Sequence, residues 1–300
     1  MWLILSSFSA FFLGCYDISK KLSVQANAVI PVLCLNTLFC TLFLLPLAII
    51  SVCNPSLLSD TIFFIPVIPF RAHFLIFIKS VIVLSSWLLG YFAIKHLPLT
   101  ITGPINATRP VMTLVGAMLI FNERLNLYQW VGVMLTIVSF FLLSASGKKE
   151  GIRFGHNKWI VFTFLSALLG SASGLYDKYL MQQLSSTAVQ FWFNLYQFIL
   201  MGIILMVLWY PQRKQSTAFE WRWSILLVSV FLTAADFIYF YALTDPDAMI
   251  SVVSMIRRSS VLVSFIGGAF IFKEKNLKAK IIDLILIFIG MVFLFLGTST

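Results

Sequence analysis

The tetrapeptide Gly-Cys-Tyr-Asp at residues 14–17 returns as Gly-Leu-Tyr-Asp at residues 174–177. A second repeat relates Phe-Asn-Glu-Arg at residues 121–124 to Phe-Lys-Glu-Lys at residues 272–275. The spacing between Arg109 and Arg258 equals that between Ala93 and Ala242, so the two halves correspond at several points along their length. Self-similarity of this kind indicates a fold built from two copies of one unit.

The chain is too apolar for a water-soluble protein. Of its 300 residues, 60% are hydrophobic and 11% are charged, whereas soluble domains contain about 45–50% apolar and about 25% charged residues. The net charge of +10 is not gathered on a basic, aromatic-rich face. We therefore expect lysine and arginine to set the membrane topology, and we predict no nucleic-acid partner. The predicted surroundings are a lipid bilayer, crossed many times.

Ten apolar segments are long enough to cross a bilayer, which takes about 20 helical residues. Prolines, glycines and charged residues separate them. Five spans in each half would make the second copy enter the membrane in the opposite sense. The sequence thus predicts an all-α protein of ten transmembrane helices arranged as an inverted 5+5 repeat. The expected spans are residues 2–22, 29–52, 73–94, 99–121, 127–146, 158–180, 186–210, 223–243, 247–272 and 277–297.

The same segments give the expected domain organisation. Residues 1–146 form the first five-helix unit and residues 158–300 form the second. Between them, residues 147–157 are a short basic linker. Glu123 and Glu274 close the fourth and ninth spans and are flanked by bases, so we interpret them as interfacial charges that fix the helix ends.

The order of these motifs resembles the drug/metabolite transporter superfamily, and within it the EamA-like transporters. In each copy the fourth span ends in the Phe-x-Glu element quoted above, and a span carrying Gly132 or Gly290 follows. The resemblance implies a carrier of the inner (plasma) membrane that alternates access around a central cavity. Members move amino acids, sugars, drugs and other small metabolites, so the resemblance names no substrate.

Three arginines lie well inside predicted spans: Arg109 in the fourth, and Arg257 and Arg258 in the ninth. A charge at the bilayer centre costs at least about 2.5–3.5 kcal/mol, so these side chains should face the protein interior. Inverted symmetry would place Arg109 opposite Arg258, as a clamp for a carboxylate or phosphate. The alternative is that each arginine forms a structural ion pair with an aspartate of another span.

The fourth span also carries Pro104 and Pro110, each of which frees a backbone carbonyl four residues earlier. In lipid such carbonyls need a partner, so this span should line a wet cavity beside Asn106, unless the prolines only kink the helix.

Other polar residues within spans are further candidates for the site. Asp236 matches Trp87 of the first half, and it could carry a proton, pair a substrate amine or neutralise one of the arginines. Asp17 and Asp177 either form gating ion pairs or are solvated helix ends. Asn36 and Asn194 either line the cavity or bond between helices. Aromatic walls for a substrate could come from Trp87, Tyr91, Trp192 and Tyr196, and Tyr239, close to Asp236, is a further candidate for substrate binding.

The sequence contains no zinc-protease, phosphate-loop or serine-hydrolase motif, so we predict no enzymatic activity, no cofactor and no metal. We predict a secondary-active transporter for a small polar metabolite with an anionic group, bound by arginines and asparagines, with Asp236 as the coupling candidate. The alternative function is a flippase or membrane enzyme acting on an anionic lipid. The protein is expected to be a monomer or homodimer.

Overall fold

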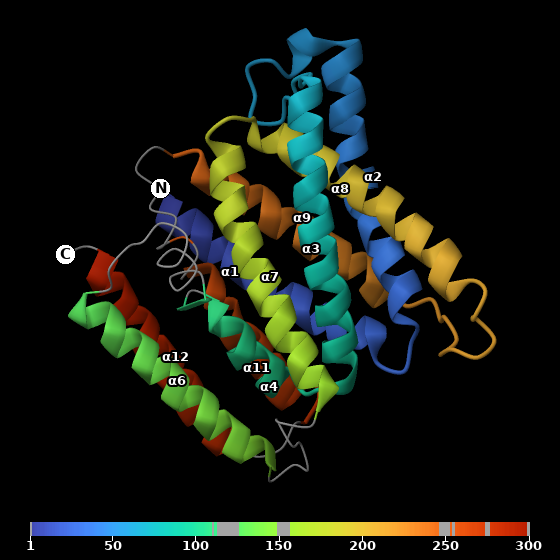
Figure 1. Ribbon diagram of the computed structural model, residues 1–300. Coiled ribbons are helices and arrows are strands. Elements are labelled where there is room, and N and C mark those ends of the chain that lie inside the picture. Colours follow the sequence, from blue (N-terminus) through green and yellow to red (C-terminus); the bar gives the residue numbers. More distant parts are fainter. Residues whose placement is uncertain are drawn as a thin grey trace.

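The computed structural model describes residues 2–109, 111–112, 126–148, 157–245, 253, 256–273 and 277–298. These residues are almost entirely helical, and none of them lies in a strand (Figure 1). The helices of the first half are α1 (Trp2–Val24), α2 (Val29–Cys53), α3 (Phe70–His96), α4 (Leu99–Ala107) and α6 (Leu127–Lys148). Those of the second half are α7 (Lys158–Met181), α8 (Ser186–Ile204), α9 (Trp223–Leu243), α11 (Ser260–Phe270) and α12 (Leu277–Thr298).

Two shorter elements complete the description. A single 3-10 turn, η1 (Pro55–Leu57), follows α2, and the π-helical stretch η3 (Leu205–Trp209) continues α8 without a break. Pro46 lies inside α2 and Pro104 inside α4. The helices α1, α2, α3, α9, α7 and the continuous α8–η3 are long and apolar enough to cross a membrane.

The expected all-helical membrane fold is therefore confirmed, with six spans supported within the described ranges. The third span begins a few residues earlier than expected, at Phe70, because Pro69 precedes its first turn. The fourth and ninth expected spans are described only in part, as α4 and α11 with short neighbouring stretches. Glu123 and Glu274 lie outside the described residues.

Helices from the two halves pack against one another (Figure 1). Helix α1 packs on α9 as α3 packs on α7, and α1 contacts α11 as α4 contacts α7. The pairs α2 with α8, α4 with α11, and α6 with α12 each join equivalent helices. If each helix is replaced by its equivalent in the other half (α1 by α7, α3 by α9, α4 by α11), the contact of α1 with α9 becomes that of α7 with α3. The contacts therefore follow an approximate two-fold relation, and this relation pairs α4 with α11.

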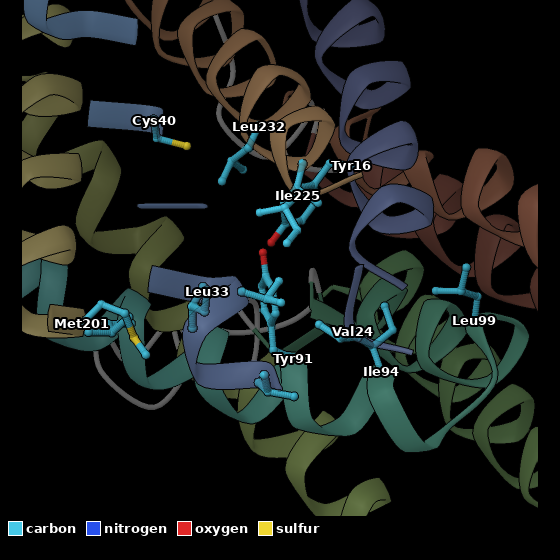
Figure 2. Close-up of a cluster of buried hydrophobic side chains, with 14 residues drawn as sticks. Tyr16, Val24, Leu33, Cys40, Tyr91, Ile94, Leu99, Met201, Ile225 and Leu232 are labelled. Atoms are coloured by element: carbon cyan, nitrogen blue, oxygen red, sulfur yellow. The ribbon is translucent and has the colours of Figure 1, made fainter. Parts of the chain in front are cut away.

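An apolar core lies where α1, α2, α3, α8 and α9 meet. It contains Leu33, Met201 and Ile225, all of them shielded from solvent. Figure 2 shows that Tyr16 and Tyr91 point their hydroxyl oxygens toward each other within this core. Two phenols from α1 and α3 thus meet among aliphatic side chains, next to the charged residues described below.

The close approach of α1 to α11 depends on Gly14. A methyl group at this position would lie 2.9 Å from the carbonyl oxygen of Ser260 and would overlap the side chain of Val263. Around its counterpart in the repeat, Gly174, no atom of the described residues lies within 4 Å of the same virtual methyl group. Within the described part of the chain, packing between helices therefore requires glycine at position 14 and not at position 174.

This difference gives a matched test of the packing. Because both glycines are helical, alanine gains the same intrinsic helix propensity at either site. We expect Gly14→Ala to be less stable than Gly174→Ala by about 1–3 kcal/mol, the usual cost of an overfilled interface. Unfolding of the two purified variants in the same detergent measures the difference. Equal stabilities would show that α1 and α11 do not approach as closely as described.

Candidate functional site

Charged side chains from several helices converge inside the helical bundle. We call this set the central charge cluster; its members are Asp17, Lys20, Lys79, Arg109, Asp177, Asp236, Arg257 and Arg258. Arg258 lies within electrostatic reach of Arg109, Arg257 and Asp17. Asp177 is coupled in the same way to Lys79, Arg257 and Asp236. Sequence-distant charges thus meet in one region, as the expected pairing of the fourth and ninth spans requires.

The most deeply buried pair joins α3 to α7. Lys79 is 1% exposed, and its Nζ lies 2.5 Å from Oδ1 of Asp177, which is 8% exposed. The same ammonium lies 4.7 Å from the ring centroid of Phe193 and 4.3 Å from that of Phe240. An ammonium between a carboxylate and two aromatic faces is stabilised by charge and by the ring quadrupoles.

This pair corrects one sequence-based expectation. Asp177 is a buried ion-pair partner, so the interpretation as a solvated helix end is wrong for this residue. The partner is Lys79, which the sequence analysis did not select. On α1, the equivalent Asp17 pairs with Lys20. The repeat places the counterpart of Lys20 at position 180, which is Leu180, so Asp177 cannot form the same pair within its own helix.

On α1 the equivalent acid is paired within its own helix. Asp17 Oδ1 lies 2.8 Å from Nζ of Lys20, one turn further along. The Lys20 ammonium also lies 4.4 Å from the ring centroid of Tyr16 and 5.2 Å from that of Tyr91. The structure therefore contains the ion pair with Lys20 that was one of the two readings for Asp17.

A third ion pair joins α9 to the segment before α11. The carboxylate of Asp236 pairs with the guanidinium of Arg257. The guanidinium carbon of Arg257 also lies 4.0 Å from the ring centroid of Tyr239. Three roles were predicted for Asp236: carrying a proton, pairing a substrate amine or neutralising an arginine. The structure contains the ion pair that the third role requires.

The remaining two cations have no such partner in the described ranges. Neither Arg109 nor Arg258 has a described carboxylate within ion-pair distance, and the Nε atom of each is buried without a hydrogen-bond partner there. Nη2 of Arg109 donates to Oδ1 of Asn106 at 3.1 Å. Ser171 donates to the backbone carbonyl of Arg109 at 3.1 Å. The described hydrogen bonds thus orient Arg109 through neutral groups, with no ion pair among the described residues.

The asparagine predicted on the second span connects two helices and keeps a spare donor. Asn36 is fully buried, and its Oδ1 accepts a hydrogen bond of 3.0 Å from Ser229 on α9. Its Nδ2 has no partner among the described residues, and the same holds for Oγ1 of Thr233. Cys40 lies one turn further along α2, with its Sγ 3.7 Å from Asn36 Oδ1 and 3.8 Å from the backbone carbonyl oxygen of Ser229.

Helix α8 contributes further buried amides. The predicted Asn194 is 4% exposed. Three residues along, Gln197 is fully buried, and neither its Nε2 nor its Oε1 has a described hydrogen-bond partner. Gln197 was not among the predicted site residues, although its spacing of three residues from Asn194 places the two amides on one helix face and could have indicated it.

The predicted aromatic residues do not form one wall. Trp87 packs edge-on against Phe193, with ring centroids 6.1 Å apart, beside the Lys79–Asp177 pair. Trp192 belongs to another group, in which its ring centroid lies 4.5 Å from that of His73, and His73 hydrogen-bonds to the Tyr196 hydroxyl at 2.7 Å. Tyr91 and Tyr239 contact cations of the cluster, as described above.

No group of three or more histidine, cysteine, aspartate or glutamate side chains in the described part of the chain is placed to hold a metal ion. As far as the described residues go, the cluster holds three ion pairs, in which the charges balance, and two guanidinium groups, those of Arg109 and Arg258, that have no carboxylate partner.

Comparison with known proteins agrees with this architecture. The model of the EamA-like transporter family matches residues 1–145 and 157–296, one match for each half. A solved structure described only as "Crystal structure of protein" is similar over 99% of this chain and 98% of that chain, with a TM-score of 0.61 and 14% identity, which supports the fold alone. No curated protein matches the chain.

Proposed function

We propose that this protein carries a small polar metabolite with an anionic group across the membrane by secondary-active transport. The proposal starts from the family: the chain belongs to the EamA-like transporter family. The family and the apolar helices make it a multi-pass membrane protein, and the family points to transport of small molecules rather than to catalysis. Our proposal adds the anionic character of the substrate, alternating access and location in the inner (plasma) membrane.

A ten-span inverted repeat is part of the proposal. Its support is the two-fold relation among the helix contacts, which pairs α1 with α9 as it pairs α3 with α7. In carriers built from such repeats, the substrate site lies at the interface of the copies near the bilayer midplane. In this chain that interface is where α4 packs on α11 and where the charges converge.

The observation that carries the proposal is that neither Arg109 nor Arg258 has a carboxylate within ion-pair distance among the residues that the structure describes. An unpaired cation inside a membrane protein is costly, and such residues typically mark the path of a substrate or ion. A guanidinium group binds carboxylate and phosphate through two parallel hydrogen bonds. An anion lying between Arg109 and Arg258 would therefore remove an electrostatic penalty that the empty carrier bears.

Polar groups around the arginines favour a polar substrate body. Nδ2 of Asn36, Oγ1 of Thr233 and both amide atoms of Gln197 lack described partners, and a buried donor or acceptor left unpaired costs about 1–3 kcal/mol. We assign orientation of the substrate to Asn36, Asn106 and Asn194. Gating is assigned to Asp17 and Asp177.

Coupling to protons would involve Asp236. Because this carboxylate is paired with Arg257, protonation would release the guanidinium and change the charge of the site. Flux measured in proteoliposomes with and without a pH gradient tests this part separately. Equal flux in both conditions would remove Asp236 from the coupling role and leave the substrate proposal intact.

The substrate proposal is tested by a thermal-shift screen of the purified protein against anionic, zwitterionic and cationic metabolites. Binding to the folded state adds about 2.7 kcal/mol of stability when the ligand is a hundredfold above its dissociation constant. We expect anions to raise the melting temperature. Stabilisation by cations alone would contradict the proposal, and stabilisation by anionic lipids alone would favour the lipid-handling alternative.

A further inference from the structure

The central charge cluster contains more positive than negative charge. Its acids are the three aspartates, each in an ion pair: Asp17 with Lys20, Asp177 with Lys79, and Asp236 with Arg257. None of the ion pairs in the described residues involves Arg109 or Arg258, so these two guanidinium groups remain. Within the described residues the cluster therefore holds two positive charges in excess.

The two surplus charges act on one region. Arg109 lies two residues beyond α4 and Arg258 two residues before α11, and these two helices pack against one another. Arg257 and Asp17, each already in an ion pair, lie close enough to interact electrostatically with both. Charges interact far more strongly inside a protein than across water, because the local dielectric response is weaker. A ligand with one negative charge would leave one cation unbalanced, whereas a ligand with two would neutralise the site.

We infer that the substrate's anionic part carries two negative charges, as in a phosphomonoester or a dicarboxylate. This inference rests on the proposed function and narrows its substrate class. The two sources share the required chemistry: a dianion places oxygen acceptors against two planar guanidinium forks, each of which can donate two parallel hydrogen bonds. The loaded site is then electrically neutral, which favours its enclosure within the membrane.

The test uses pairs of ligands that share one skeleton and differ by one charge. Phenyl phosphate is compared with methyl phenyl phosphate, and succinate with succinamate, at pH 8 by calorimetry or thermal shift on the purified full chain. We expect the dianion of at least one pair to bind about tenfold or more tightly than its monoanion. The pair that shows the larger ratio identifies phosphate or dicarboxylate as the source.

Variants connect the ratio to the arginines. Arg258→Gln removes one surplus charge, so the ratio of dianion to monoanion affinity should fall to about one. Arg258→Lys keeps the charge and should keep the preference. The exposed Arg71 on α3 provides the matched control, and Arg71→Gln should leave the ratio unchanged. If Arg258→Gln does not fold, Arg109→Gln removes the other surplus charge and makes the same prediction.

The outcomes separate the inference from the proposed function. Monoanions that bind the native protein as tightly as their dianions would overturn the inference while leaving an anion carrier. A ratio that persists in both arginine-to-glutamine variants would also overturn it, because the preference would then come from other residues. If no anion of either charge binds, the proposed function itself fails.

Discussion

Replacing Lys79 by methionine should lower the free energy of unfolding by about 3–5 kcal/mol, the usual cost of removing one partner of a buried ion pair. Methionine is close to lysine in length, so the variant keeps most of the packing between Phe193 and Phe240 and removes mainly the ammonium group. The penalty comes from Asp177, which would remain buried at 8% exposure without the counter-charge that now lies 2.5 Å away.

The double variant Lys79→Met/Asp177→Leu distinguishes the net contribution of the ion pair to stability from the penalty of leaving the Asp177 carboxylate buried without a partner. Buried ion pairs can often be replaced by apolar residues with little loss, because both desolvation penalties disappear together. We expect the double variant to recover at least half of the stability lost by Lys79→Met. Denaturation by SDS in mixed micelles gives the three free energies needed for the comparison.

An exposed pair in the same protein provides the control. Nη2 of Arg222 lies 3.1 Å from Oε2 of Glu220, and these side chains are 30% and 63% exposed. Breaking it with Glu220→Gln should cost about 0–1 kcal/mol, as exposed pairs usually do. If Lys79→Met were equally mild, the Lys79–Asp177 pair would not be buried in the way described.

The positions of most helices could be predicted from the sequence. The apolar segments placed eight helices within a few residues of their observed ends, because a bilayer demands long uninterrupted apolar runs and charged or breaking residues end them. The internal repeat also led to the expectation that Arg109 and Arg258 would face each other. That expectation follows from symmetry and needs no knowledge of side-chain packing.

Pairing partners could not be predicted in the same way. The position of a residue within a span predicts its depth in the bilayer but not the rotation of the helix about its own axis. The sequence therefore did not predict that Lys79 would pair with Asp177. The repeat even suggested similar surroundings for Asp17 and Asp177. Their surroundings differ because Lys20 is replaced by Leu180 in the second copy. Trp192 was expected in one aromatic wall with Tyr196 and Trp87; it lies beside Tyr196 and His73, whereas Trp87 packs against Phe193.

Replacing Arg109 by glutamine should reduce flux of the anionic substrate by about 100-fold or more. Loss of one charged partner from a buried, hydrogen-bonded pair costs about 2–5 kcal/mol, and each 1.4 kcal/mol is a factor of ten. Gly170→Ala should act in the same direction but more mildly, because its methyl group would lie 2.5 Å from Nη1 of Arg109 and must displace the guanidinium. Uptake into proteoliposomes at equal protein content measures both effects.

Stability distinguishes this role from the alternative in which Arg109 is a structural ion pair. Arg109 is partly buried and has no described carboxylate within ion-pair distance, so glutamine removes a desolvated charge without breaking a described ion pair. The melting temperature of ligand-free Arg109→Gln should therefore stay unchanged or rise, whereas that of Lys79→Met should fall. Arg109→Gln with a lowered melting temperature and near-native flux would instead make Arg109 structural. Loss of flux without loss of stability is expected of a residue whose partner is the substrate, because the charge that completes its environment arrives only with the cargo.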